Sequence, residues 1–142
     1  LDQSLRVWNA DTGELIRSLS QHTGSIHALA LRPSTEGLPM VAPSATDRTI
    51  RFWQPTIGRM VRFARLASRP LDVAWLPDGS RVVVACTDGH VRVVDPVNVK
   101  VTHDLPALQG WAYSLAVHPT DGSILVGGQG GQGGQLRRVV IR

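Results

Sequence analysis

The sequence predicts an all-β fold, a β-propeller segment of four-stranded antiparallel blades with about three blades in this chain. Three observations predict it. A seven-residue motif recurs along the chain, a second alternating pattern recurs in the same order, and Asp-Gly turns separate short apolar runs. No segment has a sustained helical period, so helical repeat folds are excluded.

The first repeated motif reads DQSLRVW, DRTIRFW and DGHVRVV, beginning at Asp2, Asp47 and Asp88. Each copy has Asp at its first position, Arg at its fifth and a large apolar residue at its seventh. The seventh positions are separated by 45 and 41 residues, and they are Trp8, Trp53 and Val94. That period is typical of a four-stranded propeller blade and not of a helical solenoid.

The second pattern is an alternating strand that stops at a proline, in SIHALALRP (25–33), PLDVAWLP (70–77) and AYSLAVHP (112–119). LPDGS (76–80) and PTDGS (119–123) are typical of hairpin turns, and the run RVVVAC is typical of a buried strand. We therefore predict thirteen short strands. They form a partial blade at 1–20, full blades at 21–66 and 67–108, and an incomplete blade at 109–142 with a flexible Gly/Gln-rich loop at 127–135.

Composition is that of a globular protein, with 42% apolar and 18% charged residues. No apolar stretch is long enough to span a membrane, and residues 1–10 do not resemble a signal peptide, so no membrane partner is expected. Because the chain begins at Leu1 rather than Met, we expect a processed form or a piece of a longer protein. The one cysteine, Cys86, lies in an apolar run and is expected to be core filler. The compartment stays open, with the cytoplasm favoured, and the preference for arginine over lysine suggests a bacterial gene.

With these repeats the chain resembles the Trp-Asp (WD) repeat propeller family over essentially its whole length. The family's blade begins near a Gly-His pair, which is Gln21-His22 in this sequence. It ends near Trp-Asp, and the corresponding pairs here are Trp8-Asn9, Trp53-Gln54 and Val94-Asp95. The resemblance implies a non-catalytic propeller that serves as a scaffold for protein or peptide binding.

The resemblance also implies a hydrogen-bonded structural tetrad in each blade, made by a loop His, a turn Asp, a strand Ser or Thr, and the Trp. By position, His22, Asp47 and Trp53 match three of these residues. Ala45 occupies the Ser/Thr position. In the next blade the Ser/Thr, His and Trp positions are occupied by Cys86, Leu66 and Val94. The tetrad is thus degraded, and we expect blade stability to depend more on apolar packing.

The sequence predicts no catalytic residue, no cofactor and no metal site. His22 and Asp47 are interpreted as tetrad residues rather than parts of a catalytic triad, and no nucleophile-elbow serine is present. The five histidines are scattered, without the spacing of zinc ligands. Gly128, Gly130 and Gly133 formally match the dinucleotide fingerprint, but the following LRRVVIR reads as a strand, whereas that motif requires a helix.

Two sets of arginines support an alternative function, the binding of a polyanion or nucleic acid. The first set lies two positions before the Trp position and is expected, by resemblance, to form a solvated ring of charge: Arg6, Arg51 and Arg92. The second set lies in an expected outer edge strand, where charge blocks edge-to-edge association: Arg59, Arg62 and Arg65. Only Phe63 interleaves with the second set, so nucleic acid is the less favoured partner.

The resemblance places partner binding on the face formed by the loops that enter each blade. Alignment through the prolines makes Ser25, Arg69 and Trp111 equivalent. We predict that a protein or peptide partner contacts seven residues on this face, which are Thr23, Ser25, Thr46, Arg69, Thr87, Gln109 and Trp111. Trp and Arg are enriched in binding hot spots. The alternative is that Trp111 only covers the end of its blade.

About three blades cannot close a ring, because propellers have at least about four. Two interpretations stay open: further blades in a longer protein, or assembly of copies into a homo-oligomer, a dimer or a trimer. In the second case a C-terminal half blade (111–127) pairs with the N-terminal strands (5–20) of a neighbour. Trp8 and the LRRVVI segment then compete for one strand position. Because Trp8 carries the repeat signature, we expect the C-terminal strand to be displaced.

Overall fold

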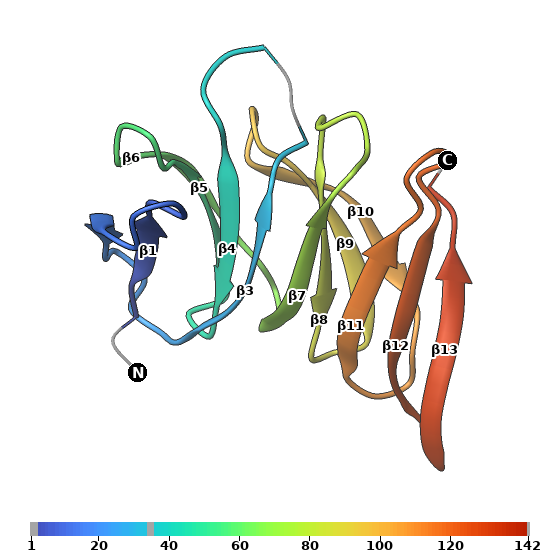
Figure 1. Ribbon diagram of the computed structural model, residues 1–142. Coiled ribbons are helices and arrows are strands. Elements are labelled where there is room, and N and C mark those ends of the chain that lie inside the picture. Colours follow the sequence, from blue (N-terminus) through green and yellow to red (C-terminus); the bar gives the residue numbers. More distant parts are fainter. Residues whose placement is uncertain (1–2, 34–35, 142) are drawn as a thin grey trace.

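Thirteen strands form four antiparallel sheets in the computed structural model, which describes residues 3–33 and 36–141 (Figure 1). The strands are β1 (Leu5–Trp8), β2 (Leu15–Leu19), β3 (Ile26–Leu31), β4 (Val41–Ala45), β5 (Thr49–Gln54), β6 (Arg59–Arg65), β7 (Pro70–Trp75), β8 (Val82–Cys86), β9 (His90–Asp95), β10 (Lys100–Pro106), β11 (Ala112–Val117), β12 (Ile124–Gly130) and β13 (Gly133–Val139). Their number confirms the prediction from the repeats. Asp2, the first position of the first motif copy, lies outside the described residues.

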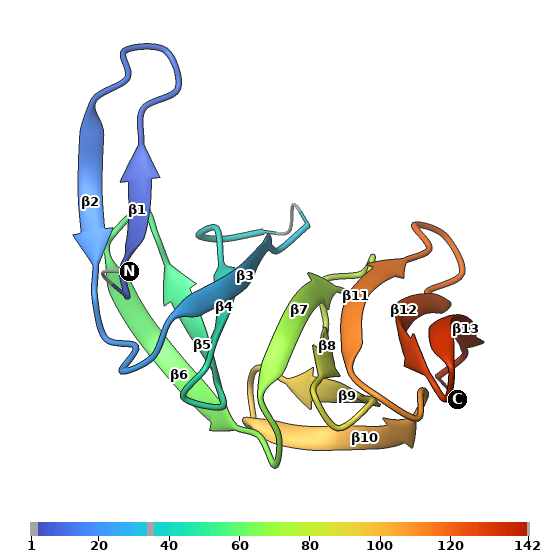
Figure 2. The same ribbon diagram turned by 90° about the horizontal axis from the view of Figure 1, so that it is seen from below.

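The sheets follow one another as blades along the chain. β1 pairs with β2, β3–β6 and β7–β10 form four-stranded sheets in sequential order, and β11–β13 form a three-stranded sheet. Figure 2 shows these blades as an open arc, with β3, β7 and β11 along its inner side and β6 and β10 along its outer side. The fold is therefore all-β with antiparallel four-stranded blades, and the described residues form no closed ring.

The same irregularity occurs where each inner strand pairs with the next strand. The register shifts between Ile26 and Ala28 in β3, between Pro70 and Asp72 in β7, and between Ala112 and Ser114 in β11. Such a bulge bends the strand and changes the direction of a side chain. The bulged positions are thus structurally equivalent in the three blades, and in the last blade the residue is Tyr113.

Apolar clusters between adjacent blades form the core. Phe52 of one blade meets Trp75 of the next edge to face, with ring centroids 6.0 Å apart, and the Trp75 indole donates a 3.0 Å hydrogen bond back to the carbonyl oxygen of Ala30. Cys86 is fully buried in this cluster, as its apolar neighbours predict. Burial raises the pKa of the Cys86 thiol to about 11, so the thiolate is scarce at neutral pH.

The prediction of a flexible loop at 127–135 is wrong. The ladder between β12 and β13 continues through Gly128 paired with Gln135 and Gln129 paired with Gly134, and it closes at Gly130 paired with Gly133. Only Gly131 and Gln132 form the turn. Glycine adopts an extended backbone as readily as a turn, so a Gly-rich run does not by itself mark a loop.

The expected displacement of the C-terminal strand applies to an assembly of copies, and the structure of a single chain does not test it. β13 pairs along its whole length with β12, while β1 pairs with β2 at the other end of the arc. A two-residue turn connects β12 to β13, so closing this hairpin costs little chain entropy. Pairing with a strand from a second chain has no such advantage.

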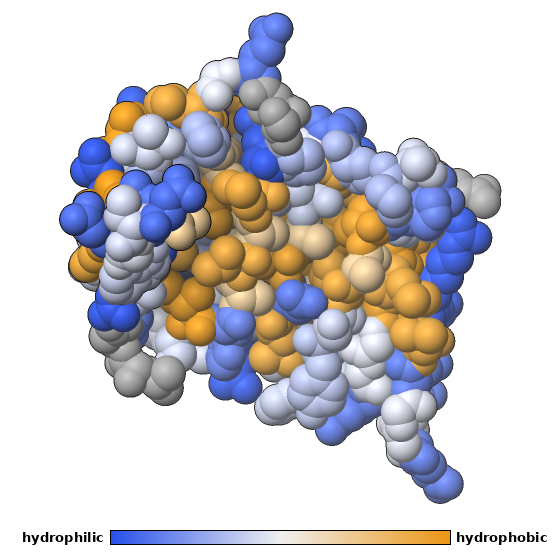
Figure 3. Space-filling model, viewed as in Figure 1, coloured by the Kyte–Doolittle hydropathy of each residue, from blue (hydrophilic) through white to orange (hydrophobic). Residues whose placement is uncertain are grey.

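Figure 3 shows apolar side chains gathered over the middle of the side that carries the inner strands. Leu29 and Leu31 of β3 contribute to the exposed apolar surface, with 53% and 64% of each residue exposed. No helix in the described part of the chain has the length and apolar character needed to cross a membrane.

Candidate functional site

The loops that enter the blades all lie at one end of the molecule, the lower end in Figure 1. One backbone hydrogen bond recurs there in each blade at 2.9 Å. The donor is a backbone amide near the end of the second strand of the blade, and the acceptor is the carbonyl oxygen of the residue just before the inner strand. The bonds run from Thr46 to Ser25, from Thr87 to Arg69, and from Gln129 to Trp111. Five of the seven predicted face residues therefore belong to these three equivalent pairs, and the sixth member is Gln129. Thr23 and Gln109 lie on the same loops and are exposed.

Arg69 and Trp111 come from adjacent blades and contact one another. The Arg69 guanidinium lies over the Trp111 ring, 5.4 Å from its centroid. The Trp111 ring in turn lies 5.8 Å from the ring of Tyr113 in a tilted arrangement. Trp111 is 41% exposed and Tyr113 is 47% exposed. Arg69, Trp111 and Tyr113 form what we call the aromatic cluster, a continuous cationic and aromatic surface.

Sequence reasoning missed Tyr113 and Gln129. The Gln129 side chain donates a 3.1 Å hydrogen bond to the Tyr113 hydroxyl, and its amide oxygen lies 3.4 Å from the backbone nitrogen of Trp111. Gln129 thus holds both aromatic residues of the cluster. Gln129 occupies the same position in the repeat as Thr46 and Thr87. This equivalence could have identified Gln129, but the Gly/Gln run was interpreted as a loop and was not aligned with the strands.

Gly128 allows β12 to approach the backbone of Trp111. A β-carbon at Gly128 would lie 2.0 Å from the Trp111 carbonyl oxygen, which no side-chain movement can relieve. We expect Gly128→Ala to lower the free energy of unfolding by about 2 kcal/mol and to shift the indole N–H resonance of Trp111. Urea denaturation and a nitrogen–proton correlation spectrum measure the two effects.

The neighbouring glycine is the matched control for this prediction. A β-carbon at Gly127 would meet only the Leu136 Cδ1 atom, at 3.6 Å, an ordinary contact distance. Gly127→Ala should leave the stability within about 0.5 kcal/mol of the unchanged chain. Equal effects of the two alanines would contradict the assigned role of Gly128.

Asp47, in the turn between β4 and β5, is the centre of the hydrogen-bond network in the β3–β6 blade. Its carboxylate accepts bonds from the Thr49 hydroxyl at 2.5 Å, from the Thr23 amide at 3.1 Å and from His22 Nδ1 at 3.1 Å. Burial disfavours the ionised form, but hydrogen bonds from Thr49, His22 and Thr23 outweigh it and lower the pKa of Asp47 to about 2. Burial also lowers the pKa of His22, against the opposing effect of Asp47, so the ring is neutral at pH 7.

Trp53 does not complete this network. It packs in an apolar cluster with Leu5, Leu19 and Val41, and no hydrogen bond among the described residues joins it to His22. His22 Nε2 is consequently buried without a partner. The physical reason is the residue at the Ser/Thr position, because the methyl group of Ala45 cannot bond to the ring.

We expect Ala45→Ser to raise the free energy of unfolding by about 1 kcal/mol, since its hydroxyl can donate to His22 Nε2. Urea denaturation measures the change. Ala42→Ser is the control, because Ala42 is also fully buried on β4 but belongs to an apolar cluster. That hydroxyl should cost about 1 to 3 kcal/mol. A loss of stability in both variants would show that His22 Nε2 is out of reach.

The third blade replaces the missing His and Trp with an arginine network. Arg92 is only 3% exposed. It donates to both carboxylate oxygens of Asp88, at 3.1 and 2.6 Å, and its Nε donates to Asp104 at 3.2 Å. His90 contacts the other Asp104 oxygen at 2.6 Å. Burial disfavours the charged form of Arg92, but the hydrogen bonds to Asp88 outweigh it and raise the pKa of Arg92 above its usual range.

The expected solvated ring of charge is therefore wrong for Arg92. The repeated arginine pairs with the turn Asp of its own blade, since Arg51 also lies 3.7 Å from Asp47. The Arg51 side chain is only 13% exposed, so the expectation of a solvated charge is wrong for Arg51 as well. Arg6 is exposed, as the expectation requires.

Thr49 Oγ1 lies 3.3 Å from His22 Nδ1, but Thr49 is buried and its hydroxyl donates to Asp47. In residues 3–33 and 36–141, no three His, Cys, Asp or Glu side chains gather as a metal-binding group.

Comparison with known proteins gives two matching family models. Residues 41–126 match the anaphase-promoting complex subunit 4 WD40 domain, and residues 13–54 match the WD domain, G-beta repeat. The sequence is 32% identical over 82 residues to the WD repeat-containing protein AAC3 of Dictyostelium discoideum, covering 58% of this chain and 17% of that protein.

Two further relatives match over longer segments. Coronin-7 of Rattus norvegicus is 32% identical over 103 residues, covering 67% of this chain and 11% of that protein. The periodic tryptophan protein 2 homolog of Mus musculus is 29% identical over 143 residues, covering 86% of this chain and 15% of that protein. The chain thus spans between 11% and 17% of the length of these three relatives.

Proposed function

Because this chain belongs to the WD40 repeat family, whose domains are typically protein-interaction scaffolds, we propose that it binds a protein or peptide partner without catalysing a reaction. The binding surface is the loop face that carries the aromatic cluster. One observation carries the proposal: Trp111 and Tyr113 are 41% and 47% exposed and contact each other, and the Arg69 guanidinium lies over the Trp111 ring. Tryptophan, tyrosine and arginine are the residues that most often dominate binding energies.

The remaining predicted contacts surround this cluster. Thr87 shares a 2.8 Å hydroxyl hydrogen bond with Ser68 beside Arg69, and Gln109 is exposed on the loop before Trp111. Thr23, Ser25 and Thr46 extend the face toward the preceding blade. A partner that spans all seven residues crosses three blades.

Panning a phage-displayed peptide library on the chain tests the proposal. Peptides recovered on the unchanged chain should lose at least tenfold in affinity for Trp111→Ala, the loss of a hot-spot side chain. Trp8→Ala is the matched control, because Trp8 is 56% exposed but lies on the β1–β2 hairpin. Recovered peptides that bind both variants equally well, or none recovered above background, would remove the proposal.

Polyanion binding is the second candidate function, favoured by Arg59 and Arg65, which are exposed on the outer strand β6. Arg62 is less available because its guanidinium donates to the Val97 carbonyl oxygen at 2.5 Å. Binding of a single-stranded oligothymidine should then weaken steeply as salt rises. Salt-independent binding, or none, would remove this candidate.

Association of copies into a dimer or trimer is a separate proposal, which the exposed apolar residues at the open ends of the arc support. Leu29 and Leu31 lie toward one end, and Leu125 and Leu136 lie on the last blade. Light scattering after size exclusion measures the mass. A mass of one chain would remove this proposal.

A further inference from the structure

The Arg69 guanidinium has no anionic partner in the part of the chain that the structure describes. The Arg69 side chain forms no ion pair or hydrogen bond with the described residues, and it contacts the Trp111 ring instead. The Nε atom of Arg69 is buried without an acceptor. A buried, uncompensated guanidinium nitrogen is unfavourable by itself. The charge is therefore available to an anion from outside the chain.

Three carboxylates in the same blade as Arg69 are occupied by other groups. Both oxygens of Asp88 accept from Arg92, and the oxygens of Asp104 accept from Arg92 and contact His90. Asp72 Oδ2 accepts from the Leu115 amide at 2.8 Å. The uncompensated charge of Arg69 thus arises from the arrangement of the blades and not from a lack of acidic residues.

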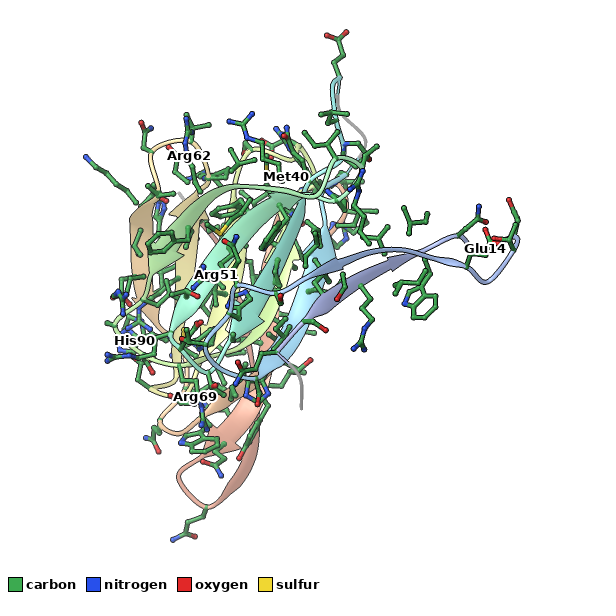
Figure 4. The ribbon with its side chains drawn as sticks, turned by 90° about the vertical axis from the view of Figure 1, so that its left-hand side faces the viewer. Glu14, Met40, Arg51, Arg62, Arg69 and His90 are labelled. Carbon is green, nitrogen blue, oxygen red and sulfur yellow. The ribbon has the colours of Figure 1, made fainter. Side chains whose placement is uncertain are left out.

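Trp111 holds the Arg69 guanidinium against its ring, with the guanidinium carbon 5.4 Å from the ring centroid. The Nε atom is enclosed, so the two terminal nitrogens, which are not among the buried unpaired atoms, are the groups that an outside acceptor can reach. A planar carboxylate is the acceptor whose geometry best matches these two nitrogens, since it can accept two parallel bonds. In Figure 4 Arg69 and His90 lie toward the same lower end of the blades, opposite to Arg62 and Met40.

Beside the aromatic cluster lies an open depression of about 580 Å³ with very few side chains. It is lined by Tyr113, Gln129, Gly128, Gly130, Gly131, Gly133 and Gly134. Tyr113 and Gln129 connect it directly to Trp111. A glycine floor has no side chains above the sheet and so leaves room for the main chain of an extended peptide.

We propose that the partner segment is an extended acidic peptide, with a Glu or Asp carboxylate on the Arg69 guanidinium and its main chain over the Gly-rich end of β12 and β13. This inference rests on the proposed function and specifies the chemistry of the ligand. It departs from the polyanion alternative, because it requires a carboxylate beside an aromatic pair and not a run of phosphates.

Titration of the full chain with two short peptides tests the inference. The probes are acetyl-Gly-Glu-Gly-amide and acetyl-Gly-Gln-Gly-amide, with inorganic phosphate as a third ligand, and the readout is the indole N–H resonance of Trp111. The Glu peptide should bind at least tenfold more tightly than the Gln peptide. Arg69→Met should abolish that difference, and Arg69→Lys should reduce it, because lysine lacks the planar fork. Arg65→Met, which removes an exposed arginine from β6, should preserve it.

Three outcomes would overturn the inference: equal binding of the two peptides, a preference for Glu that survives in Arg69→Met, or tighter binding of phosphate than of the Glu peptide. The library experiment separates this inference from the proposed function. Peptides that depend on Trp111 but carry no excess of Glu or Asp would overturn the inference and leave the binding function in place. If no peptide depends on Trp111, the proposed function fails, and the inference fails with it.

Discussion

Replacing Arg92 by methionine is expected to lower the free energy of unfolding by about 3 kcal/mol, the loss of charged hydrogen bonds to two partly exposed carboxylates. The methionine would occupy much of the same space, so packing changes little, but Asp88 and Asp104 would lose the cation that joins them. The side chains of Asp88 and Asp104 are 36% and 47% exposed, so water partly solvates the carboxylates that remain, and the cost lies below that of breaking a fully buried ion pair. Urea denaturation followed by circular dichroism measures the change.

A rescue variant separates the charge effect from packing. Adding Asp88→Asn and Asp104→Asn to Arg92→Met removes the uncompensated carboxylates, and at least half of the lost stability should return. Arg65→Met is the control for loss of an exposed arginine, and it should change stability by no more than about 0.5 kcal/mol. If Arg92→Met is as stable as Arg65→Met, the network does not hold the blade.

The strands could be predicted from the sequence because the blade signals are local and repeated. Alternation, the proline after each inner strand and the Asp-Gly turns all act over a few residues, and three copies in the same order limit errors. The equivalence of Ser25, Arg69 and Trp111 followed from the same alignment, and the structure gives all three the same backbone bond. The contact between Arg69 and Trp111 joins two blades. The alignment shows that the two residues are equivalent, but their contact follows only when the two blades are placed side by side.

Two features could not be predicted, because each depends on what surrounds a residue in space. Arg92 is buried because it meets Asp88 of its own blade and Asp104 on the paired strand β10, and neither contact can be seen in the seven-residue motif. The Gly/Gln run lacks side chains that distinguish strand from loop, and its pairing follows from the tight turn at 131–132. Tyr113 and Gln129 were missed for the same reason, since their meeting requires β12 to extend to Gly130.

Asp47→Ala is expected to lower the free energy of unfolding by about 3 kcal/mol at pH 7, because the His22 ring, the Thr23 amide and the Thr49 hydroxyl all lose their acceptor.

The unchanged chain should also lose stability in acid. The pKa of Asp47 is about 2 in the folded chain against 3.8 for a free carboxyl, so between these values the unfolded chain binds more protons. Roughly 2 kcal/mol is present above pH 4 and is lost as the pH falls toward 2. His22 adds a loss of the same sign below pH 6.5, because its pKa is lowered on folding.

Urea denaturation at pH 7, 4 and 2 separates these effects, and Asp78→Ala provides the comparison. The Asp78 carboxylate also accepts hydrogen bonds, from Ser80, and these lower its pKa, but the residue is exposed at a turn. Its removal should cost about 1 kcal/mol or less at pH 7 and leave most of the acid-dependent loss in place. Asp47→Ala should instead lose roughly 2 kcal/mol less than the unchanged chain between pH 4 and pH 2, because only the acid response of Asp47 is removed while carboxylates such as Asp88 keep their own. If the two variants show the same acid response, Asp47 is not the carboxylate whose ionisation stabilises this blade.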